Sequence, residues 1–187
     1  MKVVVYDASY HAGWVGNTWV AGGRLYRALR KVDLVIPVLF WSQVYSELQQ
    51  LPDLSITDLQ FWCHGYPGGV VINKEEVAHN RIDPRFWKGI AAKIAPTGRA
   101  WFRSCSTFAR REGQLFAQNL ANTMDRRVVG HTYITWVFQS GLHELRPGED
   151  VRWSETEGVR VREDNTVELK TSGPFEPNTV TCLHTDF

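Results

Sequence analysis

Two residues able to do nucleophilic chemistry follow two apolar runs that read as β-strands. The run 58–63 ends at His64, and the run 99–104 ends at Cys105. One helix and a small hairpin are expected between them. A strand-helix-strand crossover of this kind is nearly always right-handed and places its two strands in parallel, side by side. The carboxyl ends of such strands lie at one edge of the sheet, so we expect His64 and Cys105 to meet there.

Together these two side chains predict acyl-transfer chemistry. A free thiol is mostly protonated at neutral pH because its ordinary pKa is about 8.5. The imidazole of His64 can take that proton, the thiolate of Cys105 can attack a carbonyl carbon, and the imidazolium can then protonate the leaving amine. Gly65 has no side chain, so its backbone N–H can approach an oxyanion closely, and the N–H of Cys105 is the natural second donor.

Four further residues are candidates for substrate binding. Asp7 and His11 follow the first predicted strand and should lie at the same sheet edge. Asp7 could orient His64 or bind a substrate cation, or it could cap its own loop, a role we slightly favour. Arg103 precedes Cys105 by two residues, so it either shares the face of Cys105 or pairs with an acidic residue of the sheet. His131 follows the run 127–130 and is expected at a pocket wall.

The remaining chemistry-bearing residues fit no metal or cofactor site. The six histidines show no HxxxH or HxH spacing and the three cysteines no CxxC spacing, so we expect no metal, no disulfide framework and no cofactor. Cys63 should point away from the site because neighbouring strand residues face opposite sides, which makes it a core residue. Cys182 is expected to pack in a strand. A Gly-x-Ser-x-Gly elbow is absent from the sequence.

Strands and helices alternate through the first two thirds of the chain. Strands are expected at 2–6, 33–39, 58–63, 99–104 and 127–130, and helices from about 17, at 42–51, 83–94 and 112–124, with a break at 96–98. Ser42 is the expected cap of the second helix. Pro37 restricts the second strand to an edge of the sheet, or itself to the end of that strand. A β-hairpin is expected around 163–165. The pattern predicts one α/β domain, 1–187, with a mostly parallel sheet and a β-rich extension over about 150–187.

The arrangement resembles the caspase-like (clan CD) cysteine peptidases. His-Gly follows one strand and Cys follows the next, and the stretches 99–105, 113–121 and 127–130 resemble the bacterial caspase-like and CHAT-type domains most. The resemblance covers roughly 58–132. It implies a three-layer caspase-like sandwich, an endopeptidase activity, His64 as base, Cys105 as nucleophile and Gly65 as oxyanion donor.

Composition limits the partners that we expect. Lys and Arg total 21 and Asp and Glu 20, for a net charge of +1, which gives no electrostatic footprint for nucleic acid or an anionic membrane. The N-terminus turns polar too early for a signal peptide, and the sparse cysteines favour a reducing cytoplasm. We therefore expect a cytoplasmic protein that acts on a peptide or protein substrate.

Two other functions remain open. Caspases carry Gln-Ala-Cys and a Gly two residues after the Cys, whereas this chain has Arg-Ser-Cys-Ser-Thr. The protein could therefore be an inactive binding or scaffold module, with Trp136, Phe138 and Trp153 forming an interaction surface. Alternatively, the same dyad could serve an acyltransferase or an amidohydrolase that acts on a small molecule.

Overall fold

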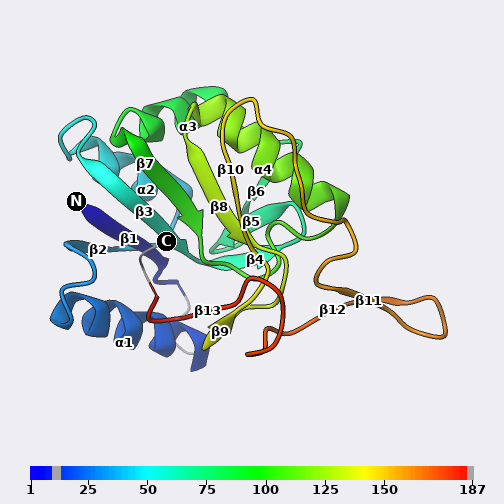
Figure 1. The fold of residues 1–187 in the computed structure, drawn as a ribbon. Helices are drawn as coiled ribbons and strands as arrows, with labels where there is room; N and C mark the ends of the chain where they lie inside the picture. The colour runs from blue at the N-terminus through cyan, green and yellow to red at the C-terminus, as the bar shows by residue number, and fades with distance from the viewer. Residues whose placement is uncertain (10–13, 185–187) are drawn as a thin grey trace.

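A six-stranded, mostly parallel sheet forms the centre of the molecule (Figure 1). The computed structural model describes residues 1–9 and 14–184. The strand order is β10-β8-β7-β3-β1-β2; only the pairing of β10 with β8 is antiparallel. The strands are β1 (Lys2–Asp7), β2 (Leu34–Val38), β3 (Ile56–Trp62), β7 (Ile94–Phe102), β8 (Arg127–His131) and β10 (Leu142–Leu145). The predicted α/β class with a mostly parallel sheet is confirmed.

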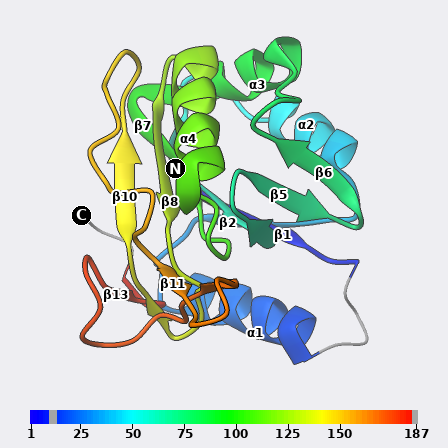
Figure 2. The ribbon, with the colours of Figure 1, turned by 90° about the vertical axis from the view of Figure 1, so that its right-hand side faces the viewer.

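Helices cover both faces of this sheet. α2 (Trp41–Gln49), α3 (Pro84–Ala91) and α4 (Arg110–Met124) lie together on one face, as Figure 2 shows, and build the main core. α1 (Trp14–Ala28) packs against β1 and β2. Val3 and Val5 belong to the main core while Val4 belongs to the smaller cluster that includes Tyr26 of α1, so successive residues of β1 serve opposite faces.

Several element boundaries differ from those expected. The stretch 96–98, predicted as a break, lies inside β7, where the pairing with β3 changes register between Ile56 and Asp58. An irregularity of this kind lets a strand pass through Pro96. α3 ends at Ala91, three residues before the expected end, and begins with Asp83 accepting a hydrogen bond from the Arg85 amide. Pro37 lies in the edge strand β2, as predicted.

Short antiparallel units of two or three strands lie outside the central sheet. β4 (His64–Tyr66), β5 (Gly69–Ile72) and β6 (Glu75–Ala78) form a three-stranded unit directly after β3. The predicted hairpin is present as β11 (Val159–Val161) and β12 (Val167–Leu169), which projects from the body of the molecule in Figure 1. β13 (Val180–Thr181) pairs with β9 (Phe138–Gln139). In the described part of the chain, the helices lack the combination of length and apolarity that a membrane crossing needs.

Candidate functional site

The strands that precede His64 and Cys105 end side by side. β3 and β7 are parallel neighbours, with Phe61 opposite Phe102 in the register, and the Arg103 amide continues the pairing by donating to the Phe61 carbonyl at 3.0 Å. Beyond the strands, Cys63 Sγ lies 3.3 Å from Ser104 Oγ. The two chain segments therefore leave the same edge of the sheet together, as predicted from the crossover rule.

Gly65 provides the closest contact between the two segments. A Cβ atom at this position would lie 2.5 Å from the carbonyl oxygen of Cys105, 3.0 Å from its amide nitrogen and 2.8 Å from Ser104 Cβ. Real Cβ atoms do not approach backbone atoms this closely, so only glycine fits here without displacing the backbone of Cys105. His64, the preceding residue, is thereby fixed on the segment that adjoins Cys105.

The half-buried thiol of Cys105 contacts one residue that the sequence did not single out. Its Sγ lies 3.7 Å from both the carbonyl oxygen and the Oγ1 of Thr135. The following residue, Ser106, has a φ of 53° and donates its amide to the Tyr133 carbonyl at 2.8 Å. The Cys105 loop is thus attached to the segment after β8. A threonine 30 residues downstream carries no sequence signal for this contact.

His64 is half-buried beside an aromatic residue of the first helix. Its ring meets Trp19 of α1 edge-on, with the centroids 5.1 Å apart and the planes at 66°. Its backbone pairs with Val71 in the β4–β5 hairpin. The hairpin therefore sets the position of the backbone, and Trp19 limits the orientation of the ring.

Cys63 belongs to the core, as predicted. It is 3% exposed and packs in the cluster between the sheet and helices α2 to α4. Burial raises the pKa of this thiol to about 12. Cys63 is therefore a neutral core residue, whereas Cys105 and Cys182 are half-buried free thiols.

Arg103 lies on the opposite side of the sheet from Cys63 and is 6% exposed. Its guanidinium donates to Gln139 Oε1 at 2.7 and 2.9 Å and to Tyr26 Oη at 2.6 Å, and it stacks 4.3 Å from the centroid of Trp101. It also donates to the Cys182 carbonyl at 2.7 Å. Burial lowers the pKa of this group. Among the residues that the structure describes, Arg103 makes no ion pair with an acidic residue of the sheet, so that expected pairing is not seen, and its hydrogen-bond acceptors are neutral.

Asp7 also makes interior contacts. It is 1% exposed, and its carboxylate accepts hydrogen bonds from the Ser9 amide and hydroxyl and from the Asn73 amide. These bonds close the loop after β1 and attach it to the β5–β6 turn, which agrees with the loop role favoured from sequence. His11, the other candidate on this loop, lies outside the described residues.

His131 is fully buried behind the sheet edge. Trp101 Nε1 donates to its Nε2 at 3.2 Å, and its Nδ1 lies 3.2 Å from the Ser140 carbonyl, so the neutral ring carries its hydrogen on Nδ1. Burial, and secondarily the charge of Arg103, lowers the pKa of His131 to about 3. The residue supports the loop that carries Ser140 and is not at a pocket surface in this structure.

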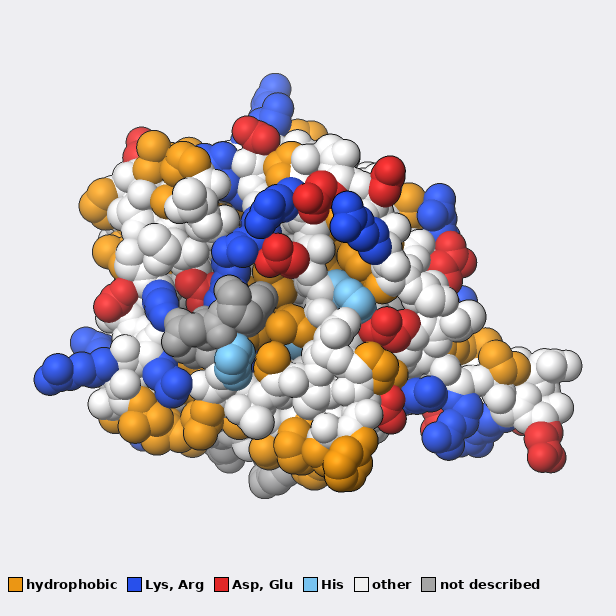
Figure 3. Space-filling model, in the orientation of Figure 1, with side chains coloured by type: hydrophobic (Ala, Val, Ile, Leu, Met, Phe, Trp, Pro, Cys, Tyr) orange, Lys and Arg blue, Asp and Glu red, His pale blue; other side chains and the backbone are white. Residues whose placement is uncertain are grey.

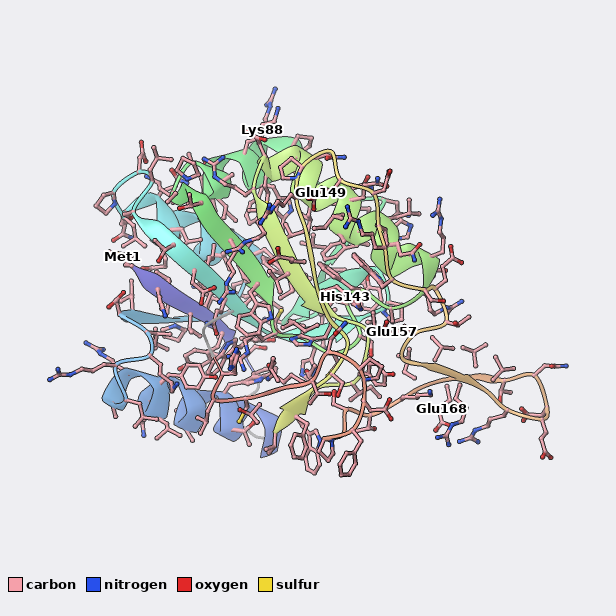
Figure 4. The ribbon with its side chains drawn as sticks, viewed as in Figure 1. Met1, Lys88, His143, Glu149, Glu157 and Glu168 are labelled. Carbon is pink, nitrogen blue, oxygen red and sulfur yellow. The ribbon has the colours of Figure 1, made fainter. Side chains whose placement is uncertain are left out.

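His143 and Glu157 form a histidine–carboxylate pair that the sequence analysis did not single out. His143 Nε2 is 2.7 Å from Glu157 Oε1 beside β10, where Figure 4 shows the two side chains close together. Burial alone would raise the pKa of Glu157, but hydrogen bonds from His143 and Thr132 bring it below its ordinary value. A groove of about 600 Å³ runs past His143 along β10 and does not include Cys105. Within residues 1–9 and 14–184, His, Cys, Asp and Glu form no cluster of three that could hold a metal.

Comparison with known proteins found no match to this chain among family models, curated proteins or solved structures.

Proposed function

We propose that the protein is a cysteine hydrolase, most specifically an endopeptidase, with Cys105 as nucleophile and His64 as base. The observation that carries this proposal is the contact of Gly65 with the Cys105 backbone. It holds a histidine segment and a cysteine segment against each other at the carboxyl edge of two parallel strands, where open α/β sheets place their sites.

In the proposed reaction, His64 takes the thiol proton and Cys105 Sγ attacks the peptide carbonyl carbon. The developing oxyanion is received by the backbone N–H groups of Gly65 and Cys105. The imidazolium then protonates the leaving amine, which leaves a thioester on Cys105. Water, deprotonated by His64, hydrolyses the thioester and releases the acid. The protein's own residues supply each proton transfer in this scheme.

We further propose a caspase-like relationship and a cytoplasmic location. The mostly parallel sheet with helices on both faces is compatible with the resemblance, and the free thiols are compatible with a reducing compartment. In this proposal Arg103, Asp7 and His131 support the site from beneath, since all three are buried.

A peptide-library assay tests the proposed activity. Wild type should cleave a subset of peptides, and Cys105→Ala and His64→Ala should each abolish cleavage, whereas Cys182→Ala should retain it. Iodoacetamide should label Cys105 in the folded protein, more slowly in His64→Ala. Equal null results for all chains, together with no preferential labelling of Cys105, would refute the catalytic proposal.

An interaction module is the second candidate, favoured by an exposed apolar surface. Trp136 is 57% exposed, Val137 53% and Phe175 99%. Figure 3 shows apolar side chains gathered at the lower edge of the molecule, below β9. Trp153, expected in this surface, is instead buried against Phe108 and does not contribute. Capture of a partner that survives Cys105→Ala but fails with Trp136→Ser would support this function over catalysis.

An acyltransferase or small-molecule amidohydrolase would use the same dyad. Mass spectrometry of the products separates these reactions from proteolysis, since acyl transfer yields a conjugate of the acceptor while hydrolysis of a peptide yields two fragments.

A further inference from the structure

The C-terminal residues Val180–His184 form a strap across the carboxyl edge of the sheet. In Figure 1 this segment, with β13, runs between α1 and the ends of the central strands. β13 pairs antiparallel with β9, and the Cys182 amide extends the pairing by donating to the Val137 carbonyl at 2.7 Å. A segment from the end of the chain thus lies beside the candidate site.

The strap supplies two of the acceptors of Arg103. The guanidinium donates to the carbonyl oxygen of Cys182 at 2.7 Å and to that of His184 at 3.5 Å. Among the described residues, all its hydrogen-bond acceptors are neutral. A buried cation needs such acceptors because desolvation is costly. Arg103 lies two residues before Cys105, so the docked strap is attached to the nucleophile's own chain segment.

The strap also fixes the loop that contacts the thiol. Thr135, whose carbonyl and hydroxyl oxygens approach Cys105 Sγ, lies two residues before Val137, which accepts the Cys182 amide. Gln139, opposite Val180 in the β9–β13 pair, accepts two hydrogen bonds from Arg103. The strap, the Thr135 loop and Arg103 therefore form one connected unit on the side of Cys105 where Thr135 lies.

Within this unit, the strap itself is held more weakly than the strands of the central sheet. β13 pairs over two residues, Cys182 is half-buried and Leu183 is 41% exposed. Isolated two-stranded pairs are marginally stable, and segments with few buried apolar contacts open at lower free energy than the core. The strap can therefore detach while the central sheet remains folded.

We propose that Val180–His184 is an autoinhibitory strap. Docked, it holds the Thr135 loop on the Cys105 thiol and covers Arg103; detached, it releases the thiol and uncovers the guanidinium beside it. The inference concerns regulation of the site assigned above and rests on that proposed function for its consequence in catalysis.

The test compares Cys182→Pro with Cys182→Ala in the full chain. Proline removes the N–H that donates to Val137, whereas alanine keeps the backbone bonds and removes only the thiol. Iodoacetamide labelling of Cys105, followed by peptide mass mapping, should be about fivefold faster in Cys182→Pro, the change expected when an opening equilibrium loses one ordinary hydrogen bond. Cys182→Ala should label at the wild-type rate. Peptidase turnover is measured on the same samples.

A second variant tests the strap independently, so that the proposal can still be refuted when Cys182→Pro does not fold. A chain ending at Thr179 should label rapidly at Cys105, and a synthetic peptide of residues 179–184 should slow that labelling, while a scrambled peptide should not. Three results would each overturn the proposed strap. These are equal labelling of wild type and Cys182→Pro, no effect of the added peptide, and unfolding of both Cys182→Pro and the chain that ends at Thr179.

The two proposals fail separately. Faster labelling without turnover in any chain would support the strap and refute the hydrolase. Turnover that is the same in wild type, Cys182→Pro and Cys182→Ala, with unchanged labelling, would refute the strap and leave the hydrolase standing.

Discussion

Gly65 lies against the backbone of Cys105 with no room for a side chain between them. A Cβ on Gly65 would come within 2.5 Å of the Cys105 carbonyl oxygen. The contact connects β4 with the turn after β7. Together with the contact of Gly65 with Ser104 Cβ, it sets the separation of the histidine and cysteine segments.

Gly65→Ala should damage both stability and the site. The methyl group must push the two backbone segments apart, and overpacking of this kind costs about 1–3 kcal/mol of the free energy of unfolding. Urea denaturation should show this loss, and Cys105 labelling at fixed pH should change as His64 is displaced. Gly173→Ala is the control, because its Cβ would meet nothing closer than Glu176 Cγ at 3.7 Å. A Gly65→Ala chain as stable as the control would contradict the contact.

The local pattern of apolar residues was sufficient to predict where the segments of His64 and Cys105 lie in the sheet. The apolar runs before His64 and Cys105 are strands, and the crossover rule placed them in parallel because strand handedness and helix length leave few alternatives. Cys63 was predicted in the core because alternation along a strand fixes which side a residue faces. Each of these inferences depends on neighbours in sequence or on one short crossover.

Contacts that depend on distant segments were missed. Thr135, Trp19 and the strap reach the site through packing between elements far apart in sequence, and their residue types are ordinary for a loop, a helix and a terminus. Ser42 is predicted to cap α2, but the helix begins at Trp41, so its N-cap residue is Phe40. The side chain of Phe40 makes no capping hydrogen bond. The carboxylate of Glu75 accepts from the Trp41 amide instead. A helix cap that is supplied by a residue of β6, far away in the sequence, leaves no residue pattern near the start of the helix from which it could be predicted.

Glu75→Ala should therefore weaken the start of α2. Glu75 Oε2 accepts the Trp41 amide at 3.0 Å, which satisfies one of the free N–H groups at the helix N-terminus and places a negative charge there. Loss of a cap costs about 1 kcal/mol. Urea denaturation of Glu75→Ala and of the neighbouring control Glu76→Ala should show this loss for Glu75 alone; equal losses would mean that the cap contributes nothing specific.

His131 should make the fold sensitive to acid. Its pKa is about 3 in the folded protein because burial disfavours the charged ring, while an unfolded histidine titrates near its ordinary 6.5. The unfolded state therefore binds more protons between these values, and stability falls as pH drops through this window, by up to about 1.4 kcal/mol per pH unit. His131→Gln, which keeps a donor and an acceptor, should flatten this dependence in urea titrations at several pH values. His79→Gln should not, and an unchanged slope in His131→Gln would argue against the buried neutral ring.

Cys63 should resist modification for as long as the protein stays folded. The thiol is 3% exposed and burial raises its pKa to about 12, so neither reagent access nor thiolate is available in the native state. Alkylation then requires unfolding, and for an ordinary domain this slows the reaction by at least about 10³-fold relative to the unfolded chain. Peptide mass mapping after iodoacetamide treatment should show Cys105 and Cys182 modified in native buffer and Cys63 modified only in urea. Comparable native rates at Cys63 and Cys182 would show that the turn after β3 opens independently of the core, and the fixed placement of His64 would then be lost.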